Sequence, residues 1–137
     1  MPAKDRYHAT VKRALIKDGW QIRREQINLI VEARQFQLDL CAFAEIEGSL
    51  TTIFVEIKSF LGHSPVEDLA AASGKYLLYR LALDESGQEN TALYLAVPDT
   101  AYAAILTERI GTLARDRIAM KLLVFSTTQE EILEWIP

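Results

Sequence analysis

The sequence predicts a single α/β domain in which helices flank a central mixed β-sheet. Residues 3–18 have apolar side chains at helical spacing, and Gly19 is placed to end that helix. Residues 50–60 form the most β-branched stretch of the chain, and a helix-start signal follows it directly. The chain has 137 residues, which is the length of one domain, since domains commonly contain about 100–150 residues. We therefore expect one hydrophobic core across residues 1–137.

The other elements are expected in a regular order along the chain. Ser64, Pro65 and Glu67 have the spacing of a capping box with proline at the first helical position, so a helix should begin there. Gly74 within this helix predicts close backbone packing. The predicted strands cover residues 20–24, 27–30, 36–43, 50–60, 92–97 and 120–125, and the predicted helices cover 3–18, 65–83 and 99–110. Helical connections favour parallel strands and the turn at Gly48 favours a hairpin, which predicts a mixed sheet.

The composition excludes several classes of protein. Half of the residues are hydrophobic and 25% are charged, as in ordinary globular proteins, so disorder, collagen and coiled coil fit poorly. No long apolar run occurs and the N-terminus is charged, so we expect a cytoplasmic protein that does not enter a membrane. The single cysteine, Cys41, cannot close an intramolecular disulfide, and with only two histidines it cannot build a four-ligand zinc site.

The charge is distributed unevenly along the chain. The first 34 residues contain eight Lys and Arg against four Asp and Glu, whereas residues 35–100 contain three against ten. The formal net charge of −4 argues against strong non-specific nucleic-acid binding, because each phosphate contact normally needs a Lys or Arg. It is compatible with carboxylates gathered around a metal, or with a protein that meets DNA together with a basic partner.

The strongest candidate site consists of Asp39, Glu56 and Lys58. Strand side chains alternate, so Glu56 and Lys58 share a face about 7 Å apart, and a hairpin about Gly48 would place Asp39 opposite Glu56. Two carboxylates on adjacent strands offer the oxygen ligands that Mg²⁺ prefers, and a lysine could orient water or stabilise charge on a phosphate. This pattern predicts phosphodiester hydrolysis with Asp39 and Glu56 as metal ligands. The alternative is an ordinary ion pair on a solvated strand.

Three further residues are accessory candidates. Asp5 and His8 lie one turn apart in the first predicted helix, where they could support a metal ligand or carry a proton; the alternative is a helix-dipole acid beside a surface histidine. Lys75 lies one turn before Tyr79, so both could face a phosphate; the alternative is a solvated lysine and a packed tyrosine.

Four stretches resemble the XisH family, the fdxN element excision controlling factors, and the resemblance extends over nearly the whole chain. These stretches are residues 1–8, 14–20, 55–62 and 93–98. The resemblance implies a restriction endonuclease-like fold of the PD-(D/E)XK superfamily, with Asp39, Glu56 and Lys58 at the motif positions. Leu38 stands where that motif usually has proline, and Lys75 stands where a glutamine is expected in many relatives.

The same resemblance implies a role in site-specific DNA rearrangement in heterocyst-forming cyanobacteria. The expected partners are DNA, a recombinase and a companion excision controlling factor resembling XisI. Our leading hypothesis is an accessory factor with Mg²⁺ or Mn²⁺ at Asp39 and Glu56, Lys58 as the catalytic lysine, and the basic first helix nearest the DNA. The alternative is a non-enzymatic module that binds the companion factor, or a second copy of itself, through its acidic middle and apolar strand edges.

Overall fold

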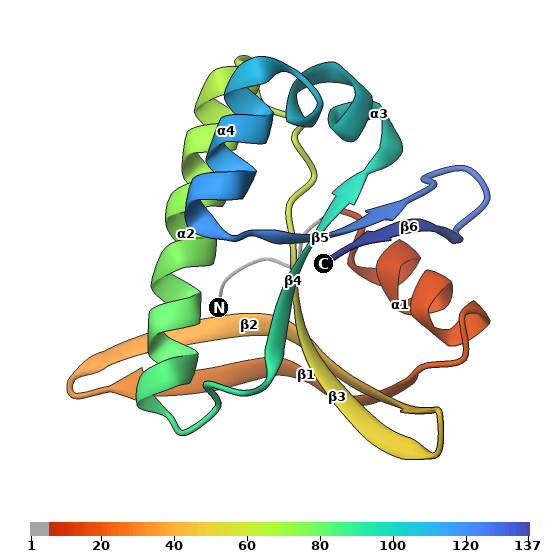
Figure 1. Ribbon diagram of the computed structural model, residues 1–137, viewed down its shortest axis with the longest axis vertical. Coiled ribbons are helices and arrows are strands. Elements are labelled where there is room, and N and C mark those ends of the chain that lie inside the picture. Colours follow the sequence, from red (N-terminus) through yellow and green to blue (C-terminus); the bar gives the residue numbers. More distant parts are fainter. Residues whose placement is uncertain (1–5) are drawn as a thin grey trace.

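A six-stranded mixed sheet forms the centre of the molecule, and helices lie on both of its faces (Figure 1). The structure is a computed structural model and describes residues 6–137. The strands follow one another across the sheet in chain order, from β1 at one edge to β6 at the other. This arrangement confirms the predicted α/β class with a mixed sheet flanked by helices.

As far as Pro98 the elements agree with the sequence prediction, except that one strand replaces the two predicted over 20–30; after Pro98 they differ more. The strands are β1 (Gln21–Val31), β2 (Arg34–Ile46), β3 (Ser49–Ile57), β4 (Ala92–Pro98), β5 (Lys121–Phe125) and β6 (Ile132–Ile136). The helices are α1 (His8–Lys17), α2 (Pro65–Glu85), α3 (Asp99–Ala101), the π-helical turn η1 (Tyr102–Leu106) and α4 (Arg109–Ile118). The helix predicted over 99–110 is therefore divided, and α4 and β6 were not predicted.

The first three strands form an antiparallel meander joined by two tight turns. The turn between β2 and β3 contains Glu47 and Gly48, both in the left-handed region, with φ of 50° and 81°. Two short strands were predicted over 20–30, but β1 is continuous from Gln21 to Val31 and contains a bulge between Ile22 and Arg24.

Helices connect β3 to β4 and β4 to β5, as the sequence predicts, whereas a loop connects β5 to β6. β3, β4 and β5 pair in parallel, and β6 pairs antiparallel with β5. Ser64 Oγ accepts a hydrogen bond of 3.2 Å from the backbone amide of Glu67, which confirms the predicted N-terminus of α2. Parallel pairing requires such a crossover because the chain must return to the same end of the sheet.

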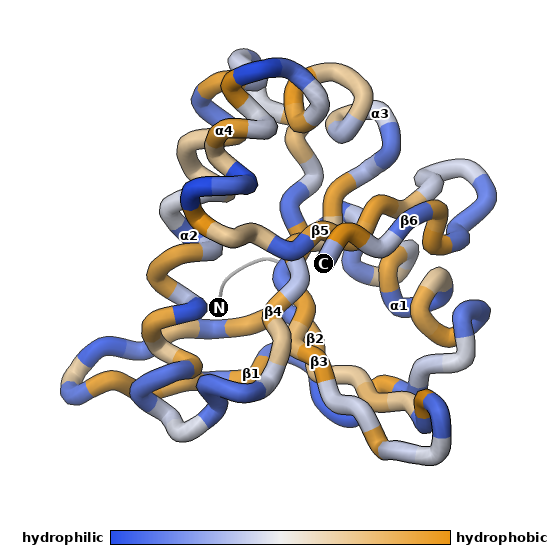
Figure 2. The backbone as a smooth tube through the Cα atoms, in the orientation of Figure 1, coloured by the Kyte–Doolittle hydropathy of each residue, from blue (hydrophilic) through white to orange (hydrophobic). Residues whose placement is uncertain are grey.

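Two hydrophobic clusters occupy the two faces of the sheet. One lies under α2, η1 and α4, and the other lies under α1. Figure 2 shows that hydrophobic stretches concentrate in the strands that cross the middle of the molecule. Tyr76 of α2 is 2% exposed and its hydroxyl donates to the Leu93 carbonyl at 2.7 Å while accepting from the Lys121 amide at 3.2 Å. Helix α2 is thereby fixed across β4 and β5.

Two glycines in helices have opposite surroundings. A Cβ atom at Gly74 would meet nothing within 4 Å, so the close packing predicted there is wrong: α2 exposes this side to solvent. A Cβ at Gly111 would overlap the carbonyl oxygen of Ile105 and lie 2.7 Å from Leu106 Cα. The close approach of α4 to η1 therefore depends on a glycine at position 111.

None of the helices in residues 6–137 is long and apolar enough to cross a membrane.

Candidate functional site

Asp39 and Glu56 meet where the pairing of β2 with β3 ends. The last paired residues before this point are Leu40 and Val55. One position further, side-chain carboxylates accept hydrogen bonds from the backbone amides of the opposite strand. The Asp39 amide donates to Glu56 Oε1 at 3.2 Å, and the Ile57 amide donates to Asp39 Oδ2 at 2.8 Å. Each carboxylate thus satisfies a backbone amide of the other strand. The structure brings the two predicted carboxylates together on one face of the sheet.

Glu56 is the most unusual acidic residue of the site because it is completely buried. Burial raises the pKa of Glu56 from its ordinary value of 4.5 to about 9, and the neighbouring Asp39 adds to this effect while Lys75 opposes it. Glu56 is therefore protonated at neutral pH. A buried carboxyl with a strongly raised pKa beside a second carboxylate is typical of a functional site.

Lys75 of α2 is the cation nearest to the carboxylates. Its Nζ lies 2.9 Å from Glu56 Oε2, although no donor in residues 6–137 meets that oxygen with hydrogen-bond geometry. The same ammonium lies 5.4 Å from the ring centre of Tyr79, one helical turn further along α2. The Lys75 side chain is 45% exposed, so it can leave Glu56 and reach a ligand without unfolding the helix.

Lys58 lies in a different environment from the one expected. β3 ends at Ile57, and the Lys58 amide still donates to the Ala96 carbonyl at 3.0 Å. Its Nζ lies 3.9 Å from Asp68 Oδ1 near the start of α2, a distance that allows only a weak ion pair. Lys58 is therefore held beside Asp68, while the lysine in contact with the carboxylates comes from the helix.

His8 lies on the other face of the sheet, which α1 covers. Its ring is 3% exposed and Nε2 lies 2.8 Å from Glu25 Oε1, so the histidine is buried rather than on the surface. Asp5, its predicted neighbour, lies outside the described residues.

The basic residues of α1 are also engaged on that face. Lys12 donates to Glu25 at 2.9 Å, and Arg13 Nε donates to Glu130 at 2.8 Å. Helix α1 covers the face opposite Asp39 and Glu56, and these two cations already have acidic partners. That the first helix lies nearest the DNA stays a prediction.

The two carboxylates fit a divalent cation that retains most of its other ligands. Among residues 6–137, no cluster of three or more His, Cys, Asp and Glu side chains gathers around one point. Mg²⁺ commonly binds through one or two carboxylates and completes its shell with water and substrate phosphate. Glu56 Oε2 is buried and already has one cation beside it, the Lys75 ammonium at 2.9 Å, whose place a divalent ion would take.

Arg23 and Arg24 are candidates that the sequence patterns leave unassigned. Both line a pocket on the face that α2 covers, together with Cys41 and Phe54, which lie two residues from Asp39 and Glu56 along their strands. The sequence signal that could have identified Arg23 and Arg24 is the occurrence of two consecutive charged residues in a strand. Such a pair breaks the alternation of faces and indicates a bulge.

The fold and the site together define an α/β protein with two adjoining carboxylates, one of them buried, where two antiparallel strands separate. Residues 1–133 match the family model described as XisH protein. The chain belongs to the XisH family.

Two solved structures resemble the chain over nearly its whole length. One is an XisH family protein from Nostoc punctiforme PCC 73102, with 36% identity, a TM-score of 0.86, and coverage of 97% of this chain and 100% of the other. The other is an fdxN element excision controlling factor protein from Anabaena variabilis, with 35% identity, a TM-score of 0.85, and coverage of 98% and 100%. A search of curated proteins found no match.

Proposed function

We propose that this chain is an accessory factor for DNA element excision with a metal-dependent phosphodiesterase-type site on a PD-(D/E)XK, restriction endonuclease-like fold. The observation that carries the proposal is the exchange of carboxylate-to-amide hydrogen bonds between Asp39 and Glu56 at the point where β2 and β3 separate. A related protein is described as an fdxN element excision controlling factor, which favours DNA as the substrate.

Asp39 and Glu56 are the residues that would hold Mg²⁺ or Mn²⁺. When bound, such an ion polarises a phosphoryl oxygen and lowers the pKa of a bound water. Glu56 must lose its proton to act as a ligand, because a carboxyl group with a pKa of about 9 is protonated at neutral pH. Ion binding and proton release from Glu56 are therefore coupled.

Lys75 is the cation best placed to meet a phosphate at this site. If Glu56 held an ion, the half-exposed Lys75 would leave its contact with Glu56 and could pair with a substrate phosphate. Lys58 remains a second cation on the same side of the fold, with a side chain that is 30% exposed and paired weakly with Asp68. Either lysine can stabilise charge that develops on the phosphate.

Calorimetry with Mg²⁺ and Mn²⁺, with and without a DNA duplex, tests this proposal. The unmodified protein should bind the ion, and Glu56→Gln should lose at least about tenfold in affinity because the amide provides no negative charge. Glu89→Gln, at an exposed position, is the matched control and should bind as the unmodified protein does. Equal affinity in all three proteins, or no binding even with DNA present, contradicts the proposed site.

DNA cleavage is tested separately with the same variants. Nicking or cleavage that needs Mn²⁺ or Mg²⁺ and disappears in Glu56→Gln supports a phosphodiesterase. If the ion binds at Glu56 and no DNA is cleaved in the presence of the recombinase and the companion factor, the site has a structural or DNA-binding role instead.

A second candidate function is a non-enzymatic module that binds a companion protein factor. The observation that favours it is the exposed side of α2, where Leu77, Leu78 and Leu81 are 45%, 55% and 51% exposed. This function predicts a complex with the companion factor that survives Glu56→Gln and is lost in Leu78→Glu. The phosphodiesterase predicts that cleavage is lost in the first variant whether or not the complex forms.

A further inference from the structure

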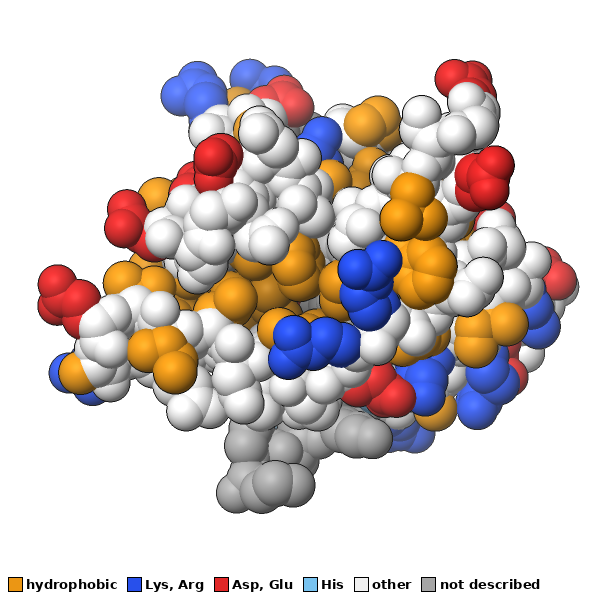
Figure 3. All heavy atoms as spheres, turned by 90° about the horizontal axis from the view of Figure 1, so that it is seen from below, with side chains coloured by type: hydrophobic (Ala, Val, Ile, Leu, Met, Phe, Trp, Pro, Cys, Tyr) orange, Lys and Arg blue, Asp and Glu red, His pale blue; other side chains and the backbone are white. Residues whose placement is uncertain are grey.

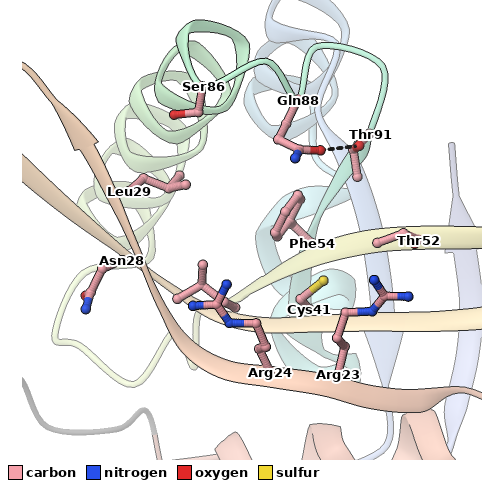
Figure 4. Close-up of a pocket in the computed structure, with 11 residues that line it drawn as sticks. Arg23, Arg24, Asn28, Leu29, Cys41, Thr52, Phe54, Ser86, Gln88 and Thr91 are labelled. Carbon is pink, nitrogen blue, oxygen red and sulfur yellow. Dashed lines mark hydrogen bonds between the residues drawn. The ribbon is translucent and has the colours of Figure 1, made fainter.

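A pocket of about 430 Å³ lies beside the carboxylate pair, between the meander β1–β3 and the chain that follows α2 (Figure 4). Strand residues Cys41 and Phe54 lie within it, and Ser86, Gln88 and Thr91 close its other side. Its volume lies within the range of about 300–1,000 Å³ that is typical of small-molecule sites. Seen from below the view of Figure 1, the surface has a hollow with a hydrophobic floor and with Lys and Arg side chains beside it (Figure 3).

The bulge in β1 places two arginines at this pocket. Arg24 is paired with Cys41, Ile22 is paired with Ala42, and Arg23 is the additional residue between them. Figure 4 shows the guanidinium groups of Arg23 and Arg24 on either side of the Cys41 side chain. A regular strand would direct adjacent side chains to opposite faces, so the bulge brings two positive charges to one pocket.

Neither guanidinium is neutralised by a carboxylate of residues 6–137. Of the Asp and Glu side chains in residues 6–137, none forms an ion pair with Arg23 or Arg24, although Arg13 and Arg80 have such partners. The guanidinium carbon of Arg23 lies 4.7 Å from the ring centre of Phe43, which leaves its donors available. Unpaired arginines at the edge of a pocket are suited to a phosphate, which they bind through two parallel hydrogen bonds.

The pocket and the carboxylate pair lie on the same face of the sheet. Cys41 is two residues from Asp39, and Phe54 is two residues from Glu56, which corresponds to about 7 Å along each strand. Successive phosphates of an extended nucleic-acid strand are separated by a similar distance. A strand with one phosphate at the carboxylates can therefore place its neighbour at the arginines.

We propose that this pocket binds an unpaired nucleotide of the DNA strand, with Arg23 and Arg24 on its phosphate and its base against Phe54. The choice of a nucleotide rests on the proposed function. Phe54 offers the apolar surface on which a base can stack, and the Gln88 amide nitrogen and the Thr52 hydroxyl are polar groups at the pocket for the base edge. The Gln88 Oε1 atom already accepts from Thr91 at 2.8 Å, which holds that amide in place.

The pocket holds one base and not a base pair within a stacked duplex. A duplex keeps its bases between their neighbours, so a base must leave the stack before it can reach Phe54. The preferred substrate is then DNA with a single-stranded, frayed or flipped nucleotide next to the scissile phosphate.

Binding is measured first without divalent ions, so that the carboxylate site does not contribute. The probes are inorganic phosphate, deoxyadenosine monophosphate, a short single-stranded oligonucleotide and the matching duplex. Cys41 is the only cysteine in the chain and lines the pocket. It is 5% exposed and burial raises the pKa of its thiol, so alkylation requires an opening of the pocket that a bound nucleotide opposes. The mononucleotide and the single strand should slow alkylation of Cys41 at least threefold.

Charge variants test the two arginines. Arg23→Gln and Arg24→Gln should each weaken mononucleotide binding about tenfold or more, as expected for a charge-assisted hydrogen bond. Arg34→Gln, at the exposed tip of the β1–β2 hairpin, removes the same charge away from the pocket and should change the affinity less than twofold. Thr52→Phe should weaken the mononucleotide without affecting inorganic phosphate, because it occupies only the space for the base.

The outcomes separate this inference from the proposed function. Equal losses in Arg24→Gln and Arg34→Gln, no protection of Cys41, or a duplex that binds as tightly as the single strand would overturn the pocket assignment. Nucleotide binding that persists in Glu56→Gln while no protein binds Mg²⁺ or Mn²⁺ would confirm the pocket and reject the metal site. Ion binding that depends on Glu56, without nucleotide binding, would do the reverse.

Discussion

Replacement of Glu56 by glutamine should change the pH dependence of stability in a direction that the structure determines. Glu56 has a pKa of about 9 in the folded protein and an ordinary value of 4.5 when exposed. Between these values the folded state binds more protons than the unfolded state, so the free energy of unfolding falls as pH rises. Glutamine cannot titrate, and it retains an oxygen that accepts from the Asp39 amide.

The size of this change in stability follows from the one additional proton that the folded state binds at Glu56. A single group contributes about 1.4 kcal/mol per pH unit in this interval, so from pH 6 to pH 8 the unmodified protein should lose about 2.7 kcal/mol relative to Glu56→Gln. Glu25 and Glu130 have pKa values below their usual range because of hydrogen bonds to Lys12 and Arg13, so their effects fall below this interval.

Urea unfolding at pH 6, 7 and 8 in the presence of EDTA measures the difference. The chelator removes any divalent ion that would hold Glu56 ionised. Glu89→Gln is the control for loss of a surface carboxylate and should follow the unmodified protein at each pH. Parallel stability curves for the unmodified protein and Glu56→Gln would refute the buried, protonated state of Glu56 and the coupling of ion binding to proton release.

Four further substitutions test other features of the structure. Lys75→Gln removes the cation that lowers the pKa of Glu56. In urea unfolding, the fall of stability with rising pH should therefore continue to a higher pH than in the unmodified protein. If the fall ended at the same pH in both proteins, the contact between the two residues would be contradicted. Tyr76→Phe leaves a buried carbonyl of β4 and an amide of β5 without a partner and should cost about 1–3 kcal/mol by thermal or urea unfolding, whereas a neutral change would show that the hydroxyl does not bridge them. Gly111→Ala should destabilise by about 1–3 kcal/mol through overlap with the η1 backbone. The matched substitution Gly74→Ala, at an open position, should stabilise α2 by about 1 kcal/mol. Equal effects of the two alanines would contradict the close packing of Gly111 against η1.

Local chemistry explains why much of the site could be predicted from the sequence. The turn at Gly48 sets the register of the β2–β3 hairpin, and this register places Asp39 next to Glu56. The capping box at Ser64 begins α2 where it was expected. These features depend on residues close together in the chain, so alternation and turn chemistry are sufficient to find them.

The later part of the chain could not be predicted in the same way. The apolar spacing of residues 99–110 is helical, but the structure changes from α3 to a π-helical turn and starts again at Arg109. The contact that accompanies this break is the packing of Gly111 against η1. Close backbone contact between two helices depends on the tertiary structure, so the helical periodicity of the sequence does not predict it.

The sequence by itself determined the α/β class, the order of helices and strands as far as Pro98 apart from the division of β1, and the pairing of two carboxylates across one hairpin. Only the tertiary structure decided that the lysine beside them is Lys75 and not Lys58, because α2 must cross the sheet before its side chains reach Glu56. It also decided the protonation of Glu56, since the pKa depends on burial by distant residues. Alternation along a strand assigns a side chain to a face, but the solvation and neighbours of its charge depend on the packed fold.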